Sequence, residues 1–162
     1  MKTYKAPVET QIGHIHLKVS DLKRALKFYS DLLGFEITTH YGDQAVFLSA
    51  GGYHHHIGLN TWHSKNGIRP ERNTVGLFHV ALVYPTRKDL AKILKRLNDQ
   101  GYPITGTADH GVSEAIYLDD PDGNGIELYW DKPKDQWPSK EDGSLEMYTK
   151  SLDVENLLNE IN

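Results

Sequence analysis

Two histidines and one glutamate stand where they could bind a metal ion together. His14 precedes His79 by 65 residues, and each lies early in the first β-rich segment of one half of the chain. Glu127 lies in the last β-rich segment. Two imidazoles and one carboxylate form the facial triad of non-haem Fe(II) oxygenases, which leaves positions open for substrate and oxygen. The same ligands suit Zn(II), Mn(II) or Ni(II) as a Lewis acid. The alternative is that each histidine is an ordinary core or surface residue.

Glu127 supports a metal site independently. It lies between Ile126 and Leu128, so strand alternation points its carboxylate away from two apolar neighbours. If those neighbours pack under a helix, the carboxylate faces the concave side of the sheet, where metal binding would satisfy it. Plain solvent exposure on an antiparallel strand remains the alternative.

Three further side chains could handle protons or hold a substrate. His56 shares a strand face with the position that the repeat matches to Glu127, so we expect it about 7 Å from the metal. There it could act as an acid/base, whereas His55 should point the other way. Tyr117 precedes Glu127 across a tight turn and could donate a hydrogen bond into the cavity, the alternative being an aromatic core residue. His110 lies in a loop that could close over a substrate.

The elements that must position these residues occur twice. Each half predicts a strand, a helix and three more strands. The first half places them at 11–19, 20–33, 35–41, 44–50 and 53–60, and the second at 76–84, 86–100, 103–107, 113–118 and 126–130. Residues 61–74 read as a connector. Residues 132–162 form a tail with a short capped helix near its end.

This order predicts an α+β fold with two βαβββ modules, at about 10–61 and 75–131. They should form one domain over residues 1–131, in which a curved eight-stranded sheet surrounds a metal cavity and the helices lie outside. The tail should wrap the surface or pack on a partner subunit. In the second case the protein would be a homodimer.

Composition narrows the class of protein. The 162 residues carry 18 Lys and Arg against 22 Asp and Glu, a net charge of −4 that argues against a nucleic-acid partner. Without a long apolar run or a leader, we expect no membrane association and a cytoplasmic location. Nine His and no Cys mean that any metal must be held by imidazole and carboxylate.

Two runs of the sequence carry a family resemblance. Residues 13–34 (GHIHLKVSDLKRALKFYSDLLG) and 120–129 (DPDGNGIELY) resemble the paired modules of the vicinal-oxygen-chelate superfamily. This group includes glyoxalase I, fosfomycin-modifying enzymes, bleomycin-resistance proteins and extradiol dioxygenases. The resemblance covers residues 10–131 and is strongest to catechol 2,3-dioxygenase-like proteins of Gram-positive bacteria.

The resemblance implies a function and roles for particular residues. The chain would be an Fe(II) extradiol dioxygenase that cleaves a catechol-like ring, with a small aromatic or vicinal-dioxygen substrate. The metal triad falls on His14, His79 and Glu127. The family's acid–base histidine matches His56, its substrate-orienting tyrosine matches Tyr117, and its loop histidine has His110 as candidate.

Other activities of the superfamily remain open. They are a glyoxalase-type lyase or isomerase, a fosfomycin-type thiol transferase, and a drug-binding protein without turnover. Glyoxalase I would carry a second carboxylate at the position of Gly58, and bleomycin-binding members lack the metal ligands. Typical extradiol enzymes have four modules, whereas this chain has two.

Overall fold

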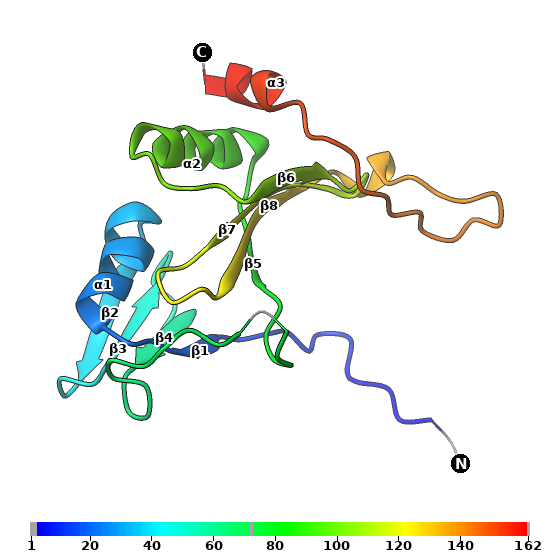
Figure 1. Ribbon diagram of the computed structural model, residues 1–162. Coiled ribbons are helices and arrows are strands. Elements are labelled where there is room, and N and C mark those ends of the chain that lie inside the picture. The colour runs from blue at the N-terminus through cyan, green and yellow to red at the C-terminus, as the bar shows by residue number, and fades with distance from the viewer. Residues whose placement is uncertain (1–2, 72, 162) are drawn as a thin grey trace. The chain divides into compact units, whose positions relative to one another are not determined.

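A computed structural model describes residues 3–71 and 73–161, which belong to two compact units, Met1–Gly67 and Ile68–Asn162. Each unit contains one βαβββ module, as predicted (Figure 1). The eight predicted strands form two four-stranded sheets, one in each unit, and neither sheet is closed, which confirms the predicted α+β fold with two βαβββ modules. None of the helices in the described ranges is long and apolar enough to cross a membrane.

The first unit is a mixed sheet with a helix on one face. Its elements are β1 (Ile15–Lys18), α1 (Leu22–Leu26) continuing into the π-helix η1 (Lys27–Leu32), β2 (Glu36–Tyr41), β3 (Ala45–Ser49) and β4 (Ile57–Asn60). The strand order is β1-β4-β3-β2, with β1 parallel to β4 and the other pairs antiparallel. Asp21 caps α1 by accepting a hydrogen bond from the Arg24 amide. One face of the sheet carries the buried residues Leu17, Val46 and Leu59, and we call the opposite face, with His16, Phe47 and Gly58, the open face.

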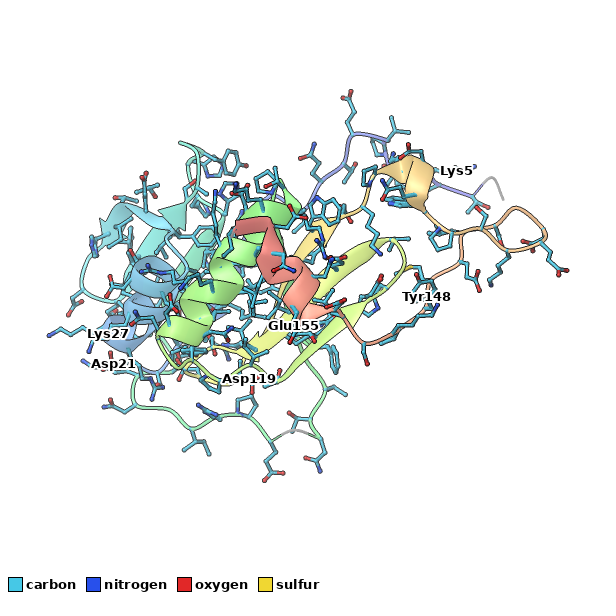
Figure 2. The ribbon with its side chains drawn as sticks, turned by 90° about the horizontal axis from the view of Figure 1, so that it is seen from above. Lys5, Asp21, Lys27, Asp119, Tyr148 and Glu155 are labelled. Carbon is cyan, nitrogen blue, oxygen red and sulfur yellow. The ribbon has the colours of Figure 1, made fainter. Side chains whose placement is uncertain are left out.

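The second unit repeats this plan and adds the tail. It contains β5 (Val80–Val83), α2 (Arg87–Asp99), β6 (Gly106–Asp109), β7 (Ser113–Asp119), β8 (Gly125–Asp131), η2 (Lys134–Gln136), α3 (Val154–Leu158) and η3 (Asn159–Ile161). The order β5-β8-β7-β6 matches that of the first unit. The predicted apolar stripe of α2 is buried, which fixes this helix on its sheet. The tail helix was predicted, and α3 lies against α2 on the side away from the sheet (Figures 1 and 2).

An ion-pair network holds the tail helix in place. The Arg87 guanidinium donates hydrogen bonds to Glu114 Oε2 on β7 and to Glu160 Oε1 in η3, both at 2.8 Å, and to Asn156 Oδ1 at 2.9 Å. Because Glu114 is buried, this pairing also satisfies a carboxylate that would be costly to leave alone. The tail is therefore an integral part of the second unit.

The strand bounds differ from the predictions where glycines and loops intervene. The predicted strand 11–19 begins at Ile15, and 103–107 is replaced by Gly106–Asp109. The predicted strand 53–60 begins only at Ile57, because Gly51 and Gly52 have positive φ angles of 69° and 81° and turn the chain before it. Residues 53–55 are therefore a loop whose side chains need not alternate between faces.

Candidate active site

The site of the second unit is built around Glu127 on β8. Its neighbours Ile126 and Leu128 are buried on the helix side, so Glu127 points to the open face as predicted, with 12% of its side chain exposed. Tyr117 on β7 is its direct partner in the antiparallel register, and the Tyr117 hydroxyl lies 2.8 Å from Glu127 Oε1, to which it donates. The ten-residue spacing across the DPDGNG turn therefore does bring tyrosine and carboxylate together.

His79 reaches the same carboxylate from the strand on the other side. It directly precedes β5, which runs parallel to β8, and its Nε2 lies 3.0 Å from Glu127 Oε2. Gly125 makes this approach possible, because a Cβ there would collide with the carbonyl oxygen of Phe78 and lie 3.1 Å from His79 Cβ. The glycine that ends the turn thus positions an imidazole beside the glutamate.

His110 extends the chain of contacts on the far side of Tyr117. Its Nε2 lies 2.7 Å from the Tyr117 hydroxyl, while its Nδ1 lies 3.0 Å from the carbonyl oxygen of Tyr148 and 3.2 Å from Thr149 Oγ1. Burial, helped by the hydrogen bond to Glu127, raises the pKa of Tyr117, so its phenol stays protonated. The Tyr117 hydroxyl thus lies between a carboxylate oxygen and an imidazole nitrogen.

A cavity of about 1030 Å³ in the second unit opens beside these residues. His79, His110 and Tyr117 line it, together with apolar side chains of the connector and of the strands. A space of this size accepts a small organic molecule. It borders three of the side chains that the sequence singled out.

In the first unit, imidazole rings gather on the open face. His16 and Phe47 both pair with Gly58 in the sheet and pack against each other, with ring centroids 5.6 Å apart. The ring of His55 lies 4.4 Å from that of His14 and 4.9 Å from that of Phe47. The expectation that His55 points away from this face is therefore wrong, because residue 55 lies in the loop before β4.

His56 is held differently from His55. The Ala50 amide donates to His56 Nδ1 at 3.3 Å, and the Ser49 hydroxyl lies 3.1 Å from the same nitrogen. Nδ1 is thus an acceptor, and the ring proton of neutral His56 is on Nε2.

The pKa of His55 is lowered, first by desolvation and then by the charge of His14.

In the first unit, the repeat matches Gly58 to Glu127, and the imidazole of His16 occupies the space that a side chain at position 58 would need. A Cβ at Gly58 would lie 2.9 Å from Cδ2 and 3.0 Å from Cγ of His16. In the second unit the equivalent cross-strand pair is Ala81 with Glu127. Each unit thus pairs one large residue with one small residue across its parallel strands. The large residue is His16 on β1 in the first unit and Glu127 on β8 in the second.

Two of the three side chains predicted to bind a divalent metal, His79 and Glu127, lie together in the second unit. Nε2 of His79 and Oε2 of Glu127 converge, and Tyr117 supports the carboxylate from behind, as outer residues of metal centres commonly do. Within the described residues of either unit, no group of three or more His, Asp or Glu side chains is arranged to hold a metal ion. The third predicted ligand, His14, belongs to the first unit, so its participation is a proposal.

Sequence reasoning missed several residues that shape the site. Tyr148 and Thr149 come from the tail, 38 and 39 residues after His110, and no local pattern links them to that histidine. Gly125 was visible only as a turn residue. His55 could have been found if the paired glycines 51 and 52 had been taken to delay the strand.

This fold is that of a known family. The sequence profile described as "Glyoxalase/Bleomycin resistance protein/Dioxygenase superfamily" matches residues 11–128, and the chain belongs to this superfamily. It is 41% identical over 152 residues to the catechol-2,3-dioxygenase of Bacillus subtilis (strain 168), covering 94% of this chain and 52% of that protein. The chain thus spans about half the length of this relative.

Two further relatives bear different activities in their names. Biphenyl-2,3-diol 1,2-dioxygenase 3 of Rhodococcus globerulus is 35% identical, over 76% of this chain and 65% of its own length. Metallothiol transferase FosB of Staphylococcus epidermidis is 30% identical, over 78% of this chain and 86% of its own length.

Solved structures share the fold. A glyoxalase/dioxygenase from Nostoc punctiforme superposes with a TM-score of 0.63 at 18% identity, over 82% of this chain and 99% of that one. Lactoylglutathione lyase from Agrobacterium tumefaciens gives 0.59 at 22% identity, over 76% and 96%. These likenesses concern the architecture of the two modules.

Proposed function

We propose that the protein is an Fe(II)-dependent extradiol dioxygenase that cleaves the ring of a catechol-like substrate. The observation that carries the proposal is the convergence of His79 and Tyr117 on Glu127 at the open face. The dioxygenases among its relatives support the same reaction class. His14, His79 and Glu127 would hold the metal, with Zn(II), Mn(II) or Ni(II) as alternative ions.

The metal and the surrounding side chains divide the chemistry. When bound, the metal supplies Lewis-acid binding for the two adjacent oxygens of a catechol and redox access to dioxygen. Tyr117 keeps its proton and can donate a hydrogen bond to an oxygen of the substrate. His110 would orient Tyr117 from the other side.

Ring cleavage also requires a proton to leave the second catechol hydroxyl and later to return. We assign this task to an imidazole of the segment before β4. Sequence reasoning points to His56, whereas the ring contact with His14 favours His55. An imidazole can take up and release a proton, and the contacts of His56 with Ser49 and Ala50 occupy only Nδ1.

Metal analysis tests the ligand assignment. The wild type should bind one divalent ion per chain, and His79→Ala should lose it, whereas His40→Ala on β2 serves as a control of the same chemical change. Equal metal content in the wild type and His79→Ala would eliminate the site.

Turnover tests the reaction and the proton carrier. Catechol in air with Fe(II) should give a yellow ring-cleaved product. Replacing the acid–base histidine with Phe should lower turnover by about 10²–10⁴-fold and leave metal content unchanged. His55→Phe and His56→Phe, made separately, identify the residue. Equal, full activity in both variants would refute an imidazole proton carrier in this segment.

A thiol-transfer activity is the second candidate. The observation in its favour is the FosB relative, of which this chain covers 86%, against 52% of the catechol dioxygenase. Loss of fosfomycin that depends on added thiol and divalent metal, without any reaction of catechol, would favour it.

A further inference from the structure

The tail of the chain runs beside the loop that carries His110. The amide of Asp109 donates to the carbonyl of Lys150, and the amide of Lys150 donates back to Asp109, both at 2.9 Å. We call residues 148–150 the C-terminal strap, and Figure 2 labels Tyr148 in it. The Asp109 carboxylate is itself held by Lys132 Nζ at 2.7 Å and by the Gly111 amide at 2.8 Å.

The loop is shaped to admit the strap. Gly111 has a φ of 81°, and a Cβ there would lie 2.8 Å from Cε1 of Tyr148 and 2.9 Å from Cγ of Pro138. The Tyr148 amide also lies 3.3 Å from the carbonyl oxygen of His110, to which it donates. Strap and loop are therefore in close contact through backbone and side chain.

The contact with the strap determines which ring nitrogen of His110 carries a proton. A carbonyl oxygen can only accept, so Nδ1 of His110, 3.0 Å from the Tyr148 oxygen, must be the donor. The Thr149 hydroxyl at 3.2 Å can accept from the same N–H. In neutral His110 the other nitrogen, Nε2, is then an acceptor 2.7 Å from the Tyr117 hydroxyl, and it competes with Glu127 Oε1 for the one proton of that hydroxyl.

We propose that the C-terminal strap is a positioning element of the active site, which keeps the proton of His110 on Nδ1 so that Nε2 can accept a hydrogen bond from the Tyr117 hydroxyl. The inference rests on the proposed function, because it concerns the residues assigned to that site. The strap lies outside residues 11–128, the part of the chain that the superfamily profile matches. Tyr148 and Thr149 thus lie outside the segment by which the superfamily is recognised.

The tautomer can be measured on the metal-free, full-length protein without substrate. Two-bond ¹H–¹⁵N correlation spectra of the histidine rings show which nitrogen carries the proton, and His110→Gln identifies the signals of this ring. In the wild type we expect the proton on Nδ1. A proton on Nε2 would overturn the proposal.

A matched pair of variants tests the strap itself. Lys150→Pro removes the amide that donates to Asp109, whereas Lys150→Met removes the same charge and keeps the amide. Lys150→Pro should change the tautomer ratio of His110 by about 2- to 12-fold toward Nε2–H, the effect of losing one net hydrogen bond. Lys150→Met should resemble the wild type. Identical spectra of the two variants would overturn the proposal.

If Lys150→Pro does not fold, as judged by circular dichroism, a second pair decides. Thr149→Val removes the hydroxyl beside Nδ1 at almost constant shape, and Thr149→Ser retains it. The first should lower the share of the Nδ1–H tautomer and the second should not. Because the readout needs neither metal nor turnover, it separates failure of this proposal from failure of the catechol reaction.

Discussion

Replacing Tyr117 with Phe should weaken metal binding without unfolding the protein. The change removes one oxygen, which donates to Glu127 Oε1 at 2.8 Å, from behind a predicted metal ligand. Loss of such an outer hydrogen bond typically costs 10- to 100-fold in metal affinity. At 1.36 kcal/mol per factor of ten, this corresponds to about 1.4–2.7 kcal/mol.

Two features of the site set the size of this effect. Glu127 is largely buried, so water replaces the lost donor poorly and the cost is not negligible. The cavity beside Tyr117 is large enough for water to enter from the other side, which favours the lower half of the range. We therefore expect a loss of metal affinity of about 10- to 30-fold.

Competition with a chromophoric chelator for Zn(II), which is not redox-active, measures this affinity. Tyr129→Phe is the matched control: it removes a hydroxyl from the same face of β8, two residues from Glu127, and that hydroxyl makes no hydrogen bond in the described part of the chain. Equal affinities of Tyr117→Phe, Tyr129→Phe and the wild type would refute the reasoning, because Tyr117 would then not support a metal ligand.

Two predictions concern stability. Lys132→Met should destabilise the second unit by about 1–2 kcal/mol, because it leaves Asp109 without its ion-pair partner. Burial raises the pKa of Asp109, but the hydrogen bonds from Lys132 and the loop amide outweigh it and hold that pKa below its usual value. The difference between wild type and variant in the free energy of unfolding, measured with urea, should thus be fully present above about pH 4. It should vanish as the pH falls through the folded-state pKa of Asp109. A difference that does not depend on pH would contradict this prediction. Gly58→Ala should cost about 1–3 kcal/mol by overpacking against His16, and the double variant with His16→Ala should recover most of it. Additive losses in the double variant would show that the two positions do not interact.

Much of the second unit followed from local sequence. Two strands joined by a tight turn have a fixed register, so the spacing between Tyr117 and Glu127 was enough to pair them. Alternation between Ile126 and Leu128 correctly aimed the carboxylate. The repeat of strand and helix patterns predicted both βαβββ modules.

What the sequence could not provide depends on contacts between distant segments. His110 is oriented by Tyr148, whose carbonyl carries no signature in the residue type. His55 was misplaced because the alternation rule was extended into a loop that begins at two glycines.

The packing of His16 over Gly58 restricts how the protein could have evolved, or could be redesigned. A carboxylate at position 58, which would make the first module resemble the second, overlaps the imidazole of His16 and is destabilising while that ring occupies the space. His16 must shrink first, so that it resembles Ala81 in the second module. The order of substitutions is therefore constrained, and a chain with a glutamate in both modules lies at least two ordered mutations away. A library that varies position 58 alone should return only small residues, whereas one that varies 16 and 58 together opens the path to a second carboxylate ligand.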